Sequence, residues 1–87
     1  TQRHINSSNS EEFMVTIKVV RSSNGKPAKG EKVAIGFSSI FRGVTSSEYT
    51  DENGEAHFDA DPGEGEVYIN GSTKYKGSIK GRVVVYI

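Results

Sequence analysis

The feature that most constrains the fold of this chain is a short alternation of apolar and polar positions, repeated between turn-forming residues. Residues 13–19 show it most clearly, because an apolar side chain occupies every odd position while Thr16 and Lys18 lie between them. A period of two in β-branched residues is typical of a strand with one buried face. No window of eleven residues has a helical period, so the sequence predicts an all-β fold.

Further segments of the same kind follow, and the predicted strands are 13–19, 32–37, 44–50, 55–60, 67–69, 74–79 and 82–87. Turn residues separate them at 22–27, 51–54, 61–65 and 70–71. Short strands at spacings of roughly 8–12 residues are typical of a seven-stranded antiparallel β-sandwich. Asn-Gly is a strong hairpin signal, so we predict that segments 44–50 and 55–60 pair across Asn53 and Gly54.

The last predicted strand differs from the others in its pattern. Residues 83–87 are apolar at every position, which predicts a strand that is covered on both faces. The same residues would also suit an edge strand that pairs with another copy of the chain. The sequence leaves both arrangements open.

Composition sets the size of the domain. The chain has 87 residues, of which 33% are hydrophobic, enough for one domain with a thin core. Residues 1–11 are polar and without a period, so we predict a disordered leader or linker there and a single domain over residues 12–87. The absence of cysteine excludes disulfides and cysteine zinc sites. No apolar run approaches the roughly 18 residues of a membrane span.

The charges argue against two classes of partner. Eleven basic and eleven acidic residues give a formal net charge of zero, so no global field attracts nucleic acid or an anionic membrane. The acidic residues of the second half all lie between Glu48 and Glu66, before any basic residue of that half. We expect basic segments of the same domain to offset this stretch.

Two segments resemble the carboxypeptidase regulatory-like domain, a transthyretin-related (prealbumin-like) family. Residues 25–35 read GKPAKGEKVAI and residues 50–58 read TDENGEAHF, similar to the patterns G-x-P-x-x-G-x-x-V and T-D-x-x-G-x-x-x-F of that family. Residues 67–71, VYING, would be its strand that rises to a glycine. The resemblance covers residues 13–87 and implies a β-sandwich of transthyretin/Ig-like, Greek-key type. Bacterial surface Ig-like and collagen-adhesin B-type domains have similar signatures and remain alternatives.

The function that this resemblance implies is non-catalytic. We expect an accessory or interaction module of an extracellular or cell-envelope protein, acting as a rigid spacer or protein-binding unit without a cofactor. Its partners would be another protein or neighbouring domains of a longer chain. A carbohydrate-binding module is the alternative if several of the exposed tyrosines share one face; the candidates are Tyr49, Tyr68, Tyr75 and Tyr86.

An enzyme is the least favoured interpretation, and no catalytic residue is predicted. Hydroxyisourate hydrolases resemble transthyretin and end in Tyr-Arg-Gly-Ser, which residues 75–78 echo as Tyr-Lys-Gly-Ser. Here the motif is followed by a whole predicted strand, and the histidine that the family carries in its first strand is absent.

A loop and a strand supply the candidate binding residues. In the loop 38–43, Ile40, Phe41 and Arg42 combine an aromatic with an arginine, a composition common at binding hot spots. The competing interpretation is that Ile40 and Phe41 cap the thin core.

On the strand 55–60, alternation places Glu55, His57 and Asp59 on one face. A two-residue turn at Asn53-Gly54 would set Glu48 opposite Asp59, a like-charge arrangement that a bound Ca²⁺ would relieve. A four-residue loop would instead set Glu48 opposite His57. We predict a solvated acidic hairpin and no metal site.

Overall fold

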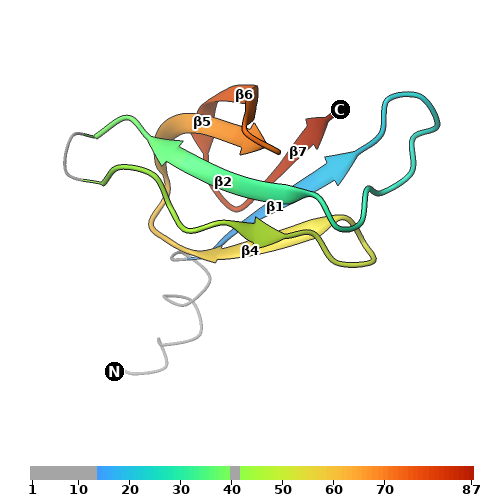
Figure 1. The fold of residues 1–87 in the computed structure, drawn as a ribbon. Helices are drawn as coiled ribbons and strands as arrows, with labels where there is room; N and C mark the ends of the chain where they lie inside the picture. Colours follow the sequence, from blue (N-terminus) through green and yellow to red (C-terminus); the bar gives the residue numbers. More distant parts are fainter. Residues whose placement is uncertain (1–13, 40–41) are drawn as a thin grey trace.

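The computed structural model describes residues 14–39 and 42–87, and these form seven strands and no helix (Figure 1). No described helix is therefore long and apolar enough to cross a membrane. Phe13, predicted in the first strand, lies outside the described residues. The strands are β1 (Met14–Val20), β2 (Lys32–Phe37), β3 (Glu48–Tyr49), β4 (Glu55–Asp59), β5 (Gly63–Ile69), β6 (Ser72–Ile79) and β7 (Arg82–Tyr86).

The strands form two sheets, and the all-β prediction is confirmed. One sheet has the order β4-β1-β7 and the other β3-β2-β5-β6. In Figure 1 the larger sheet, with β2, β5 and β6, lies above β1 and β4. Most neighbours are antiparallel, but β1 and β7 are parallel, so the prediction of an entirely antiparallel arrangement is wrong at this pair. From β1 the chain passes to β2 and β3 of the other sheet, returns to β4 beside β1, and crosses again to β5 and β6 before it reaches β7 on the other side of β1.

The alternation in the sequence places the core between the sheets. Val15, Ile17 and Val19 of β1 are fully buried, and so are Val33 and Ile35 of β2. A single cluster of buried side chains joins these to residues of the other strands, including Ala56, Phe58, Val67, Ile79, Val83 and Val85. Burial of this apolar surface is the main stabilising contribution to such a fold. The molecule thus consists of two sheets with one sandwich-like core between them.

The predicted hairpin at Asn53 and Gly54 does not form, and both proposed registers are wrong. Glu48 of β3 pairs with Val33 of β2, whereas β4 pairs with β1 in the other sheet. Between them, Gly54 N–H donates to Asp51 O in a tight turn that carries the chain from one sheet to the other. Gly54 has φ of +74°, whereas Asn53 is not among the residues with positive φ. A type I′ hairpin needs positive φ at both central residues.

The other Asn-Gly pair makes the hairpin that this dipeptide favours. Asn70 and Gly71 have φ of 52° and 88°, and they join β5 directly to its antiparallel neighbour β6. Both central residues are left-handed, as a type I′ turn requires. The prediction that the fifth strand ends at Asn70-Gly71 is therefore confirmed.

Three strands begin two or more residues away from their predicted starts. The predicted strand 44–50 is reduced to Glu48–Tyr49, because Val44 makes only an isolated bridge with Gly36. The predicted turn at 61–65 is too long, since β5 already pairs with β6 from Gly63 onward. At the other end of the hairpin, β6 begins at Ser72 rather than at residue 74.

The prediction that the last strand is covered on both faces is also wrong. β7 lies at the edge of the three-stranded sheet. Val83 and Val85 point into the core, but Val84 is 42% exposed and Tyr86 is 61% exposed. An apolar residue at every position therefore marks an edge strand here.

Candidate functional site

The outer face of the three-stranded sheet gathers most of the candidate residues. The register pairs Thr16 of β1 with His57 on one side and with Arg82 on the other. Two residues further along β1, Lys18 lies between Glu55 of β4 and Val84 of β7. The face is therefore charged along β4 and becomes apolar toward β7.

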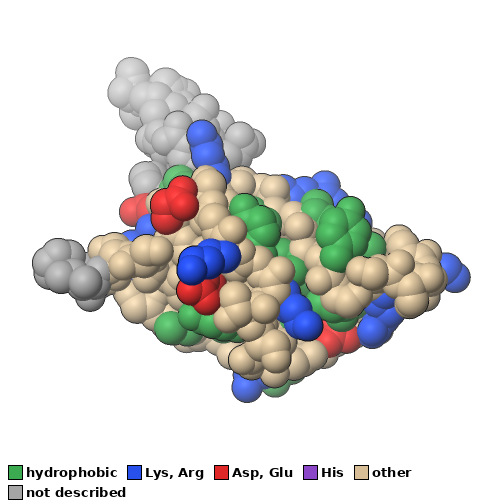
Figure 2. Space-filling view, turned by 90° about the horizontal axis from the view of Figure 1, so that it is seen from above, with side chains coloured by type: hydrophobic (Ala, Val, Ile, Leu, Met, Phe, Trp, Pro, Cys, Tyr) green, Lys and Arg blue, Asp and Glu red, His purple; other side chains and the backbone are tan. Residues whose placement is uncertain are grey.

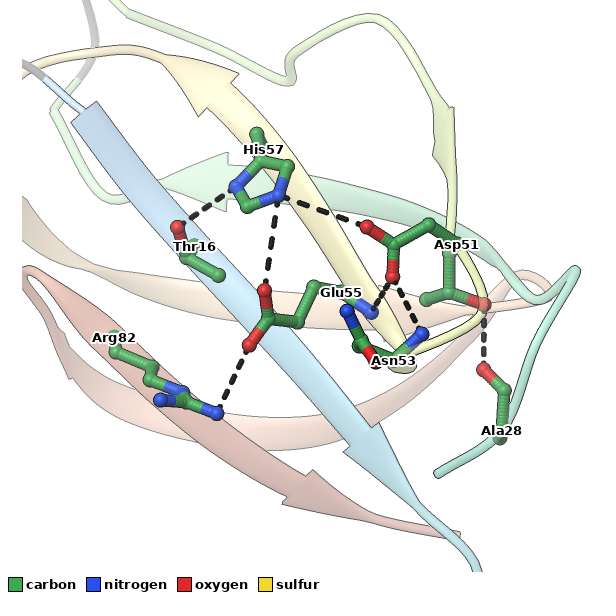
Figure 3. Close-up of polar contacts among 8 residues, drawn as sticks. Thr16, Ala28, Asp51, Asn53, Glu55, His57 and Arg82 are labelled. Atoms are coloured by element: carbon green, nitrogen blue, oxygen red, sulfur yellow. Dashed lines mark hydrogen bonds and ion pairs between the residues drawn. The ribbon is translucent and has the colours of Figure 1, made fainter. Parts of the chain in front are cut away.

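Three titratable side chains converge at the β4 edge of this face (Figure 3). His57 Nε2 lies 3.9 Å from Asp51 Oδ2 and 3.8 Å from Glu55 Oε1. The candidate ligand atoms of all three residues lie within 4.8 Å of one another. The turn at 51–54 brings Asp51 beside β4, since Asp51 N–H donates to Glu55 O at 2.9 Å.

Each of these three side chains also has a hydrogen bond or ion pair of its own. Thr16 Oγ1 and His57 Nδ1 share a hydrogen bond of 2.9 Å, and Arg82 forms an ion pair of 2.9 Å with Glu55 Oε2. Asp51 Oδ1 accepts hydrogen bonds from the backbone N–H groups of Asn53 and Glu55.

These contacts change the acidity of one group. The hydrogen bond from Glu55 N–H is the main influence that lowers the pKa of Asp51, while partial loss of solvent acts in the opposite direction. The Asn53 N–H and the nearby His57 lower that pKa further. Asp51 is therefore held as a carboxylate by the turn that it caps.

One imidazole nitrogen and two carboxylate oxygens are ligands of the kind that zinc takes. Their separations exceed the roughly 3.4 Å between ligand atoms of a tetrahedral site with bonds of about 2.1 Å. Arg82 already neutralises Glu55, and the paired neighbour Lys18 adds a second positive charge. As it stands, the arrangement is an exposed network of charges and hydrogen bonds.

The predicted set of Glu55, His57 and Asp59 is only partly brought together. Asp59 pairs with Met14 at the far end of β4 and is not in the cluster, whereas Asp51 takes its place. Sequence reasoning missed Thr16 and Arg82, because alternation shows which residues share a face but not which strand lies beside them.

The second candidate, the loop 38–43, is described in part. Ile40 and Phe41 lie outside the described residues, so the prediction for them stays a prediction. Arg42 is described: its guanidinium carbon lies 3.5 Å from the centroid of the Phe37 ring. Its nitrogens donate to Asp61 O at 2.6 Å and to Pro62 O at 3.1 Å. Arg42 therefore ties its loop to the turn that precedes β5.

The four tyrosines do not share one face. Tyr49 pairs with Lys32 and Tyr68 with Ala34, which places both on the outer face of the four-stranded sheet. Tyr86 lies on the outer face of the other sheet. Tyr75 packs against the core, and its hydroxyl donates to Ser78 O at 2.6 Å inside the Tyr-Lys-Gly-Ser segment.

Figure 2 shows the surface seen from above the view of Figure 1, and side chains of both charges lie on this face. Basic and acidic side chains are intermixed there, and hydrophobic ones lie in separate spots.

Comparison of the chain with family models, curated proteins and solved structures finds no match.

The third candidate is the outer edge of β7, which pairs with no strand of residues 14–39 and 42–87 other than β1. Val84 and Tyr86 are two of the five large hydrophobic residues exposed among the described residues. They lie two positions apart on one strand and so point the same way. The sequence left open whether this strand is covered or lies at an edge, and the order of the strands places it at an edge.

Proposed function

We propose that this chain is a non-catalytic interaction module that binds an extended segment of a protein partner along the edge of β7. The observation that carries the proposal is the combination of a strand edge that pairs with no other described strand and the exposed side chains Val84 and Tyr86. Strand addition draws its affinity from main-chain hydrogen bonds and its specificity from the alternate side chains beside them.

The two-layer core supports the rigidity that such a module needs. β1, the neighbour of β7, is buried at Val15, Ile17 and Val19 and pairs with strands on both sides. The edge is therefore presented by a central strand that the core holds in place. A rigid edge loses little conformational entropy when it binds.

The type of fold and the setting of the module belong to the same proposal. The motifs at 25–35 and 50–58 support a carboxypeptidase regulatory-like sandwich of transthyretin/Ig-like, Greek-key type. The resemblance, rather than the geometry, favours an accessory domain of an extracellular or cell-envelope protein. Tyr49 and Tyr68 share the outer face of the four-stranded sheet, whereas Tyr75 and Tyr86 do not, so the carbohydrate alternative has only two of the four tyrosines on one face.

A selection with displayed random octapeptides tests the proposal. Extended apolar peptides should be enriched on the immobilised wild-type chain and lost on Val84→Lys. Val44→Lys is the matched control, because Val44 is 63% exposed and lies beside β2 in the other sheet. A selection that enriches nothing, or that is indifferent to Val84, would contradict the proposal.

A further inference from the structure

We infer that the partner strand at this edge is β7 of a second copy of the chain, paired antiparallel about Val84. The inference rests on the proposed function of the β7 edge and names its occupant. It is carried by a comparison of the four sheet edges, by the direction of the free backbone groups of β7, and by the self-complementarity of its sequence.

Three of the four strand edges carry features that discourage pairing. The edges are β4 and β7 in one sheet and β3 and β6 in the other. β3 is only two residues long, and β4 presents Glu55, His57 and Asp59 on its outer face. Short edge strands and charged side chains are the usual protections against edge-to-edge association.

β6 is protected in a similar way, and β7 is not. β6 carries Lys74 and Lys76, and its pairing with β5 is irregular at Val67 and Tyr68. β7 reads Arg-Val-Val-Val-Tyr, with its single charge at the first position. Among the described edges, β7 is thus the one that combines an almost entirely apolar sequence with regular pairing to its neighbour.

The pairing with β1 fixes which backbone groups of β7 are free. Ile87 N–H donates to Val20 O at 2.9 Å, and Gly81 O accepts from Thr16 N–H at 2.7 Å. In a parallel ladder alternate residues face the same neighbour, so the odd-numbered residues bond to β1. The N–H and C=O groups of Arg82, Val84 and Tyr86 therefore point to the open side, where the structure describes no further strand.

The sequence of β7 is complementary to itself when it is reversed about Val84. This register pairs all five residues of the strand: Val84 lies opposite Val84 of the second copy, and Arg82 opposite its Tyr86. These pairings are of the hydrogen-bonded type, because Arg82, Val84 and Tyr86 carry the free backbone groups. A register centred on Arg82 would instead set two like charges opposite each other, which is unfavourable.

The side chains on the outer face support the same register. Arg82, Val84 and Tyr86 all lie on that face, where Arg82 already contacts Glu55 at 2.9 Å. An arginine opposite a tyrosine can place its guanidinium over the ring, a favourable cation–π contact. The two exposed Val84 side chains cover each other at the axis. The three-stranded sheets of the two copies would in this way join into one continuous sheet.

Single cysteines test the register directly, because the natural chain has none. Val84→Cys should form a disulfide-linked dimer under mild oxidation. In a hydrogen-bonded antiparallel pair the Cα atoms lie about 5.5 Å apart, within the roughly 4.4–6.8 Å that disulfides span. Arg82→Cys and Tyr86→Cys should each fail to link to themselves, since the like positions are about four residues, or ~14 Å, apart. Their mixture should give the linked heterodimer.

Sedimentation velocity tests the association without cross-linking. The wild-type chain should show a monomer–dimer equilibrium that depends on concentration. Val84→Lys should weaken it by about tenfold or more, since two like charges would meet at the axis. Val44→Lys should leave it unchanged. Because Val84→Cys is read out by its own disulfide, the inference stays testable if the lysine variant folds poorly.

The outcomes separate this inference from the proposed function. The second copy is overturned as partner if the wild-type chain stays monomeric and Val84→Cys links no more readily than Arg82→Cys or Tyr86→Cys. If the monomeric chain still enriches peptides in a manner that depends on Val84, the proposed function stands. If it enriches none, both fail.

Discussion

The hydroxyl of Thr50 donates a hydrogen bond of 2.6 Å to the carbonyl oxygen of Ala28 and accepts one of 2.8 Å from Glu31 N–H. Thr50 is 4% exposed and is the one buried polar residue among those described. It therefore fixes the end of β3 against the segment that leads into β2, immediately before the chain crosses to the other sheet.

Replacing Thr50 by valine keeps the shape of the side chain but leaves Ala28 C=O and Glu31 N–H without their partner. An unsatisfied buried polar group costs about 1–3 kcal/mol, so we expect Thr50→Val to lower the free energy of unfolding by at least that amount. Urea unfolding measures the change. Thr50→Ser keeps the hydroxyl and should retain most of the stability; equal losses in the two variants would contradict this role.

The turn at Gly54 gives a second prediction about stability. A Cβ atom at this position would lie 2.6 Å from Val19 O and 2.9 Å from Pro27 Cβ. The backbone is left-handed there, which alone costs a side chain about 1–2 kcal/mol. Gly54→Ala should therefore destabilise the fold by more than that amount in urea unfolding.

Gly25 provides the matched control for Gly54. Its φ of +70° is nearly the same, but a Cβ atom would meet nothing within 4 Å. Gly25→Ala should show only the conformational cost of about 1–2 kcal/mol. Equal effects at the two positions would show that the close approach of Val19 and Pro27 contributes little.

The strand faces could be predicted from the sequence, whereas the strand pairing could not. The inward positions of β1, β2 and β4 were correctly predicted, because burial on one face imposes a period of two on the sequence. Alternation does not specify the neighbour of a strand, and so the pairing of β4 with β1 was missed. The Asn-Gly signal was also ambiguous: at 70–71 it forms a hairpin, whereas at 53–54 Thr50 has already tied the preceding strand to the other sheet.

The prediction of the candidate sites was limited for the same reason, because the sequence does not specify which strands and turns lie beside each other. Glu55 and His57 were correctly placed on one face, but Asp51 reaches them only through the turn that caps β4. The apolar Val84 and Tyr86 left two arrangements open for the last strand, because an edge strand of a small sheet can carry the same residues as a central strand. Only the order of the strands distinguishes the two.

Arg42 is expected to stabilise its loop through contacts that a lysine cannot reproduce. Its planar guanidinium stacks on Phe37 and reaches two carbonyl oxygens at once. Arg42→Ala should cost about 1 kcal/mol, the size of a cation–π contact at an exposed site with its hydrogen bonds. Arg42→Lys should recover less than half of that loss in urea unfolding. Full recovery by lysine would show that the positive charge alone is responsible.

The partner-binding role predicted for the loop 38–43 is therefore best tested at Phe41. Because Arg42 has contacts of its own within the fold, a loss of binding in Arg42→Ala would not separate recognition from local stability. Phe41→Ala should reduce binding only if the loop, rather than the β7 edge, contacts the partner.

The lowered pKa of Asp51 predicts a pH dependence of stability. A carboxyl group whose pKa falls below its ordinary 3.8 on folding contributes stability above that pH. The contribution is lost as the pH falls through the lower pKa of the folded state.

The urea midpoint of Asp51→Asn should therefore lie below that of wild type near neutral pH, and the two should approach each other below pH 3.8. Glu52→Gln, whose side chain is 85% exposed, should show a much smaller difference at neutral pH. A gap for Asp51→Asn that stays constant with pH would contradict the assignment.

The charge network at Asp51, Glu55 and His57 is expected to bind calcium too weakly to affect stability. Ca²⁺ takes six to eight oxygen ligands, whereas this cluster offers two carboxylates and an imidazole nitrogen. One oxygen of each carboxylate is already engaged, by backbone N–H groups and by Arg82. Millimolar Ca²⁺ should therefore leave the melting temperature of the wild-type chain unchanged, since a ligand stabilises negligibly at concentrations far below its Kd. Arg82→Gln removes the competing cation, and it should be the more responsive of the two chains. A rise in the melting temperature of the wild-type chain that Asp51→Asn abolishes would show that the cluster is a calcium site after all.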